Sequence, residues 1–316
     1  MKQLLFFLFF TSFTLFAQDF SEVSEKVATY PKLISAENLA KNIARDFSSK
    51  ENQLKAAFYW ITKNIRYDLE EFYNPKNKRV SFRYRDEAER LQKIREIKDN
   101  IVRETLRSRK GVCEGYAQTL AKICSLLNIE NEVIKGYIRN SSTEINRPRN
   151  STNHAWNAVK INNQWRFIDA TWAAGAIMNG KWQRSFNPYY YNIPKDKHFK
   201  THFPESKLWQ LRIGRMTLDD FYNQPIYASS FLNSTVKLVS PQKGILTSRN
   251  NEVKIKLGNI AANQHIMVGF MGYQFAIQPK IVRTNNITTL TINPPEEAQE
   301  LFVLIDREVM LEFLIQ

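Results

Sequence analysis

Cys113, His154 and Asp169 are the residues whose types and order could support nucleophilic chemistry. A nucleophilic thiol needs a base in contact with it and a third group that orients the base. Cys113 begins a segment with apolar residues at helical spacing, so the positive end of a helix dipole would favour its thiolate. Together these side chains predict attack on a carbonyl carbon and a thioester intermediate.

The spacing of His154 and Asp169 predicts that both lie on one face of a hairpin. Two strand-like runs, 154–161 and 164–172, are separated by only two asparagines, which is typical of a tight turn. In that register His154 opposes Thr171, and Asp169 is its diagonal neighbour. We therefore expect a hydrogen bond between the imidazole and the carboxylate.

The elements that must position these residues are mainly helices in the first half of the core and strands in the second half. A polar loop, 139–153, lies just before His154, and residues 173–227 are rich in loops and aromatic residues. Hydrophobic periodicity predicts helices over 35–44, 51–65 and 86–107 and from Cys113 onward, and a strand over 132–138. The mixture predicts an α+β fold.

Cys124 lies on the same helical stripe as Cys113. Eleven residues at about 1.5 Å each would separate the two sulfurs by roughly 16 Å, too far for a disulfide. We expect Cys124 to be a packed core thiol.

The chain divides into two domains after a leader, as its 316 residues suggest. We expect a catalytic domain over 20–228 and a small β-rich, sandwich-like domain over 229–316. The evidence for the latter is a series of short β-branched runs separated by turn residues: 235–239, 252–257, 266–270, 287–292 and 301–305.

The first 17 residues have the pattern of a signal peptide. Lys2 precedes an apolar and hydroxyl run over 4–16, and Ala17 follows at a plausible cleavage point. We expect an exported protein, periplasmic or extracellular, with no integral membrane span after cleavage. The alternative is an uncleaved membrane anchor.

Composition excludes several other classes of protein. The 43% hydrophobic content supports a sizeable core, and two cysteines are too few for a disulfide scaffold or a four-thiolate zinc site. We expect neither a metal nor another cofactor. Residues 76–110 hold 13 Lys and Arg against 6 Asp and Glu within a net charge of +14, and their later part is amphipathic. A solvated basic helix is favoured over nucleic-acid binding, because no nucleic-acid-binding motif accompanies it.

Three motifs resemble those of the transglutaminase-like superfamily, most closely the bacterial branch similar to kyphoscoliosis peptidase. They are RKGVCEGYA around Cys113, NHAWNAV around His154 and FIDATW around Asp169. The likeness extends over roughly residues 35–225. It implies a papain-like α+β core with Cys113 as nucleophile, His154 as base and Asp169 as orienting group. It leaves open which of Gln53, Tyr59 and Trp60 would be the second oxyanion donor.

The resemblance admits more than one function, since the superfamily includes proteases, amidases, cross-linking transferases and inactive scaffolds. An exported cysteine peptidase or amidase is favoured; a protein-glutamine transglutaminase and a non-catalytic cell-envelope binding module are the alternatives. The expected partner is a protein or peptide, with an acidic or cell-wall peptide suggested by the cations beside both catalytic motifs. Residues of the three motifs that lie near the candidate catalytic residues are expected to bind substrate: Glu114, Tyr116, Asn153, Trp156 and Trp172.

Overall fold

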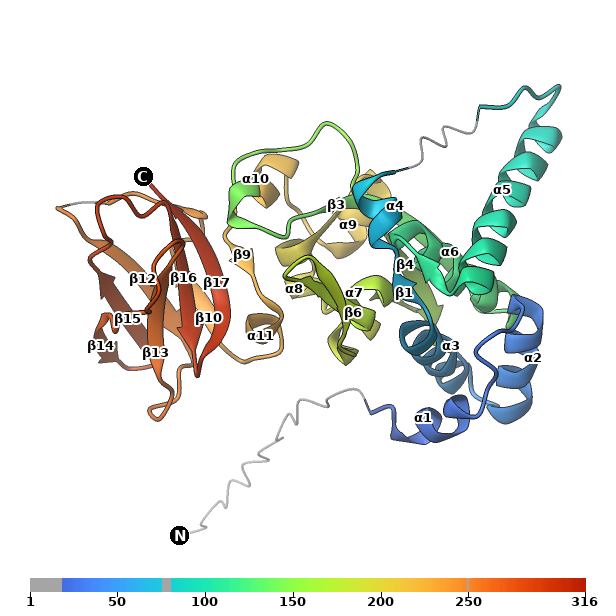
Figure 1. Ribbon diagram of the computed structural model, residues 1–316, viewed down its shortest axis with the longest axis horizontal. Helices are drawn as coiled ribbons and strands as arrows, with labels where there is room; N and C mark the ends of the chain where they lie inside the picture. The colour runs from blue at the N-terminus through green and yellow to red at the C-terminus, as the bar shows by residue number, and fades with distance from the viewer. Residues whose placement is uncertain (1–18, 76–80, 249) are drawn as a thin grey trace, which may run out of the picture.

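The computed structural model describes residues 19–75, 81–248 and 250–316, and it has an α+β core followed by two C-terminal β-sheets (Figure 1). The expected signal peptide, 1–17, lies outside the described residues. Within the described part of the chain, no helix is long and apolar enough to cross a membrane.

The N-terminal part of the core is helical. Ser35, Ser49 and Asp86 each cap a helix by accepting a hydrogen bond from the backbone N–H three residues later. The helices are α1 (Ser21–Ala28), α2 (Ala36–Asp46), α3 (Lys50–Asn64), α4 (Leu69–Tyr73), α5 (Glu87–Ser108) and α6 (Cys113–Leu126). Helix α6 packs against α2, α3 and α5, and Cys124 within it is fully buried, as expected.

Helix α5 confirms the predicted amphipathic basic helix, but only its C-terminal half is packed. Val102 and Leu106 are buried, whereas Leu91 near the start is 43% exposed. The N-terminal half projects away from the core (Figure 1). The helix ends at Arg109, which adopts a left-handed conformation with φ of 55°.

A four-stranded antiparallel sheet lies against α6 and has the order β5-β4-β3-β8. Its strands are β3 (Asn131–Ile138), β4 (His154–Ile161), β5 (Gln164–Ile168) and β8 (His202–Pro204). Strands β4 and β5 pair in the predicted register, from Ile161 opposite Gln164 to Asn157 opposite Ile168.

The predicted continuation of β5 to residue 172 is wrong. The strand ends at Ile168, because the side chain of Asp169 caps helix α7 (Ala170–Ala174). Thr171 is therefore helical and does not pair with His154.

The remaining elements of the core are short. They are the parallel pair β1 (Arg66–Tyr67) and β2 (Lys110–Gly111), the hairpin β6 (Gly175–Met178) and β7 (Lys181–Arg184), the helices α8 (Lys195–Thr201), α9 (Lys207–Ile213) and α10 (Leu218–Asn223), and the 3-10 helices η1 (Ser142–Glu144) and η2 (Pro188–Tyr191). Helix α11 (Ser229–Leu232) packs with the C-terminal part instead.

The C-terminal part consists of two sheets that enclose their own hydrophobic core. Buried residues alternate with exposed ones along the strands, as in Val253, Ile255 and Leu257 of β12. One sheet contains β10 (Lys237–Ser240), β12 (Val253–Gly258), β15 (Ile287–Ile292) and β14 (Lys280–Thr284); the other contains β11 (Ile245–Leu246), β17 (Glu308–Ile315), β16 (Glu300–Ile305) and β13 (Ile266–Phe270). This arrangement agrees with the predicted sandwich-like architecture.

The two parts are joined through β9 (Ile226–Tyr227), which pairs with β17. The strand lies just before residue 229, where the sequence analysis places the start of the β-rich domain. Ser142, in the loop before His154, hydrogen-bonds to Glu300 and Glu312 of β16 and β17.

Candidate active site

Cys113 is the first residue of α6 and is a free, half-buried thiol. Parallel pairing of Tyr67 with Gly111 fixes the chain just before it. Gly115 permits a close approach of α5, because a Cβ atom there would lie 2.7 Å from the Thr105 hydroxyl oxygen. The thiol is thus held at the positive end of a helix whose start is packed on two sides.

His154 and Asp169 form a buried hydrogen bond of 2.7 Å between Nε2 and Oδ2. The other carboxylate oxygen, Oδ1, accepts the backbone N–H groups of Thr171 (2.8 Å) and Trp172 (3.1 Å). The capping role of Asp169 therefore fixes the orientation that it presents to His154. With Nε2 turned to Asp169, the other ring nitrogen of His154 is available to Cys113, which contributes to the raised pKa of the imidazole.

The electrostatics of the pair favour an imidazolium beside a carboxylate. Burial by itself would lower the pKa of His154, but the charge and hydrogen bond of Asp169, with a contribution from Cys113, raise it to about 10. Burial opposes ionisation of Asp169, yet His154 and His202 hold its pKa well below the ordinary value. The arrangement can stabilise a thiolate–imidazolium pair.

His202 is a further member of the site that was not predicted from the sequence. Its Nε2 lies 3.0 Å from Asp169 Oδ2, so two imidazoles share one carboxylate oxygen. Its spacing from His198 in the sequence does not indicate this contact, because His202 reaches Asp169 through the pairing of β8 with β3.

The cluster of His154, Asp169 and His202 also has the composition of a metal site. A tetrahedral zinc site with ligands at 2.0–2.1 Å would separate its ligand atoms by roughly 3.3 Å. The two N···O distances, 2.7 and 3.0 Å, are instead those of hydrogen bonds, and the second nitrogen of His202 is bonded to Thr201. The residues therefore fit a hydrogen-bonded relay better than a metal centre.

None of the three residues considered as a second oxyanion donor lines the described cleft. Gln53 donates to the Phe47 carbonyl (2.8 Å), Trp60 is fully buried, and Tyr59 packs against Phe186. Tyr67 does line it, and burial followed by the charges of Cys113 and Asp169 raises its pKa. Its phenol is therefore a neutral donor facing the site.

A cleft of about 730 Å³ opens beside His154. Aromatic side chains supply much of its wall, and the C-terminal part of the chain contributes as well. Among the residues that line the cleft are Tyr67, Phe72, Trp172, Trp182, Tyr190, Tyr227, Ser229 and Glu312. Such a mixed wall suits a peptide-sized ligand.

The five predicted substrate-binding residues fall into two groups. Trp172 and Asn153 line the cleft, although both ends of the Asn153 amide bond to the backbone of Ile138. Glu114 lies on the first turn of α6, where it accepts a hydrogen bond from Gln118 (2.9 Å), and is not among the residues that line the cleft.

Tyr116 and Trp156 lie in the core rather than in the cleft wall, and each is 1% exposed. The Tyr116 hydroxyl donates to the Ile65 carbonyl (2.9 Å), which ties α6 to the end of α3. The Trp156 ring packs beneath His154 and His202. Both side chains therefore pack in the hydrophobic core. Their role in the motifs is to support the site rather than to line the cleft.

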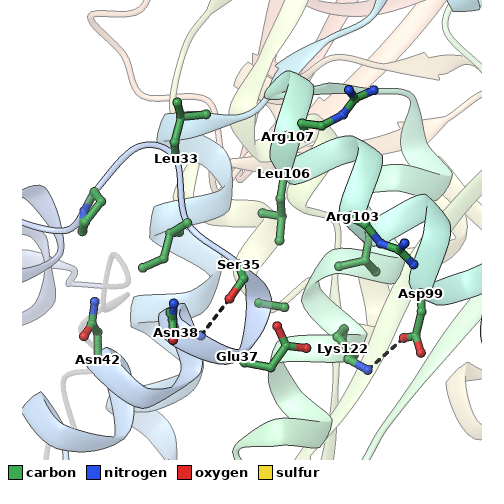
Figure 2. Close-up of a pocket in the computed structure, with 14 residues that line it drawn as sticks. Leu33, Ser35, Glu37, Asn38, Asn42, Asp99, Arg103, Leu106, Arg107 and Lys122 are labelled. Carbon is green, nitrogen blue, oxygen red and sulfur yellow. Dashed lines mark hydrogen bonds and ion pairs between the residues drawn. The ribbon is translucent and has the colours of Figure 1, made fainter.

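A second, larger cavity of about 1050 Å³ lies between the start of α2 and the C-terminal half of α5 (Figure 2). Lys122 bonds to Asp99 at its edge (2.8 Å), and Leu33 and Leu106 are among its apolar residues. None of the three candidate catalytic residues lines it, so it is separate from the site described above.

Part of this α+β core is similar to a known family. Residues 37–170 match the family model described as the transglutaminase-like superfamily, a family that includes peptidases and transglutaminases. This match confirms the resemblance found in the sequence.

Individual relatives are distant. Human kyphoscoliosis peptidase is 23% identical over 244 residues, which cover 75% of this chain and 34% of the relative, so the chain spans about a third of that protein. A crystal structure of a TGase is 21% identical and covers 48% of this chain and 34% of its own, with a TM-score of 0.30. A candidate cysteine protease from Cytophaga hutchinsonii is 19% identical and covers 53% of this chain and 47% of its own, with a TM-score of 0.28.

Proposed function

We propose that this protein is a cysteine peptidase or amidase that acts through a thioester on Cys113. The observation that carries the proposal is the buried 2.7 Å bond between His154 and Asp169, with Cys113 at the start of α6 close enough to influence the pKa of the His154 ring. These three groups supply a nucleophile, a base and an orienting carboxylate.

The reaction would proceed in two halves. The Cys113 thiolate attacks the substrate carbonyl carbon, and the resulting oxyanion is stabilised by the backbone N–H of Cys113 and by the Tyr67 hydroxyl. The tetrahedral intermediate collapses, the C–N bond breaks, and the imidazolium of His154 gives its proton to the departing amine. Water then attacks the thioester, with neutral His154 taking its proton, and releases the acid and the free thiol.

Two alternatives differ from this proposal in different ways. In a transglutaminase an amine rather than water would attack the thioester, and the family model itself includes such enzymes. A non-catalytic binding module is less well supported, because residues suited to be nucleophile, base and orienting group are all present and His154 is hydrogen-bonded to Asp169.

We further propose an exported enzyme with a peptide substrate. Export is supported by the signal-like first 17 residues, and a peptide by the aromatic and polar residues that line the cleft. An acidic or cell-wall peptide is suggested by the net charge of +14. Two of the cations near the motifs are already paired, Arg107 with Glu104 and Arg149 with Glu144, which weakens this last suggestion.

The test is a panel of peptide and glutamine acyl donors incubated with and without a primary amine. Hydrolysis that needs no amine supports a peptidase or amidase, and amine incorporation that outpaces hydrolysis supports a transglutaminase. Cys113→Ala is the matched control. Absence of both reactions, together with an unreactive Cys113, would support the binding module.

A further inference from the structure

Asp169 is bonded to a second imidazole besides that of His154. Its Oδ2 atom lies 2.7 Å from His154 Nε2 and 3.0 Å from His202 Nε2, and all three side chains are buried. The carboxylate thus receives four hydrogen bonds, since Oδ1 accepts two backbone N–H groups of α7. From this geometry we infer that His202 is a positioning residue, which holds Asp169 in the orientation that His154 needs; the inference rests on the function proposed above.

The hydrogen bonds of His202 define its tautomer. Its Nε2 must carry a hydrogen in order to donate to the carboxylate, and its Nδ1 then accepts from the Thr201 hydroxyl at 2.8 Å. Burial lowers the pKa of His202, although Asp169 acts in the opposite direction. A neutral His202 can therefore fix the carboxylate while the positive charge resides on His154.

The surroundings of His202 hold its ring in place. The Trp172 ring lies 4.8 Å from it and the Trp156 ring 5.0 Å, between centroids. Strand β8 pairs His202 with Ile138, so the backbone is part of the same sheet as His154. A group fixed by both backbone and rings is suited to orienting a neighbour.

The role differs from that of the nearby His198. The Nδ1 of His198 donates to the His202 carbonyl (3.0 Å), and its side chain makes no hydrogen bond to Asp169 among the described residues. The two histidines are equally buried. His198 therefore offers a control for packing and burial without the bond to the carboxylate.

Removal of the His202 donor would leave Oδ2 with a single partner and destabilise the ionised carboxylate. The imidazolium of His154 would then be less well stabilised, and the reactive form of the site would be lost at a higher pH. Other titratable groups that face the cluster are Cys113, Tyr67, Tyr190 and His198.

The experiment measures the rate of Cys113 alkylation by iodoacetamide from pH 4 to 9, followed by mass of the intact protein. The variants are His202→Phe, His202→Gln and the control His198→Asn. His202→Phe should slow alkylation roughly tenfold at pH 6 and move the acidic limb upward by about one pH unit, as expected for one lost bond to a charged group. His202→Gln, which can still donate, should recover most of the rate, and His198→Asn should keep the wild-type limb even if it melts earlier.

The inference is overturned if His202→Phe folds and keeps the wild-type pH profile, or if His198→Asn shifts the limb as much. Should His202→Phe fail to fold, ¹⁵N NMR of the wild-type imidazoles decides: a neutral Nε2–H tautomer from pH 5 to 8 is expected, and an imidazolium or Nδ1–H tautomer contradicts the role. Failure of the proposed function is a separate outcome, since the wild-type Cys113 would then react no faster than an ordinary thiol.

Discussion

Asp169 shows how a fully buried acid can remain ionised. Burial opposes its charge, but two backbone N–H groups and two imidazoles compensate for the lost water. The same carboxylate caps α7, so one side chain performs a structural and an electrostatic role. Because Asp169 is itself held in place by α7, it can orient His154 without depending on a flexible side chain.

Replacing Asp169 with asparagine should separate these roles. Asparagine can still cap α7, but it cannot offset the charge of an imidazolium and favours the wrong ring orientation. We expect kcat to fall by about 10² to 10⁴ with KM little changed. Steady-state kinetics on the best acyl donor provide the measurement, and unchanged kinetics would remove Asp169 from the catalytic group.

The pH dependence of stability should report the ionised pair. Because the pKa of His154 is raised to about 10, its contribution is fully present below its unfolded value near 6.5 and is lost as the pH rises toward 10. The pKa of Asp169 is lowered, so its contribution is present above about pH 4 and is lost in acid. Urea unfolding from pH 5 to 10 should therefore show a decline on the alkaline side that flattens in His154→Gln; equal slopes in both proteins would contradict the ion pair.

Among the elements, those defined by local patterns were predictable. The apolar stripe predicted α6, and two asparagines at a turn predicted the register of β4 and β5. The end of β5 was not predictable from the strand register. The strand stops there because the side chain of Asp169 caps the helix that follows. The predicted contact between Asp169 and His154 is nevertheless present, because Asp169 still directs its carboxylate toward the imidazole while it caps α7.

His202 illustrates what local patterns cannot supply. Its place beside Asp169 depends on the pairing of β8 with β3, which joins residues more than sixty positions apart in the chain. No periodicity within either segment encodes that pairing. The burial of Tyr116 on α6 and of Trp156 on β4 also depends on tertiary packing, because a position in a motif does not reveal which face of its helix or strand lies toward the cleft.

Gly136 tests how the sheet supports the site. A Cβ atom there would lie 2.2 Å from the Phe203 carbonyl oxygen and 2.5 Å from the Trp156 ring. Gly136→Ala should therefore displace β8 or Trp156 and lower the free energy of unfolding by at least about 2 kcal/mol. Gly269→Ala is the matched control, since its nearest neighbour would lie 3.6 Å away; equal stability of the two variants would contradict the close packing.

In the whole molecule, the C-terminal sheets do more than follow the α+β core. Tyr227, Ser229 and Glu312 line the cleft, and Ser142 bonds to Glu300 and Glu312. The sequence predicted a separate sandwich-like domain but no contribution to the site. Such contacts depend on how two folded parts meet, which hydrophobic patterning does not describe.

The net charge of +14 gives a prediction about substrate preference. If the field of the whole molecule attracts acidic peptides, their advantage in kcat/KM over matched neutral peptides should shrink as salt rises. The reason is that the Debye length falls from about 10 Å at 0.1 M to about 3 Å at 1 M. Equal responses of both peptides would show that the basic residues, of which Arg107 and Arg149 are already paired, form only a solvated surface.

The most direct test of the account is to trap an acyl group on Cys113. The protein is mixed with p-nitrophenyl acetate, quenched in acid and analysed by intact mass and peptide mapping, alongside Cys113→Ala, His154→Gln and Cys124→Ala. We expect one hydroxylamine-labile acetyl group on Cys113 in the wild type, none in Cys113→Ala and slow acylation in His154→Gln. Cys124→Ala should be acylated normally, because Cys124 is buried and its pKa is raised to about 12. Acylation that is absent from Cys113, or equally fast in His154→Gln, would contradict the account.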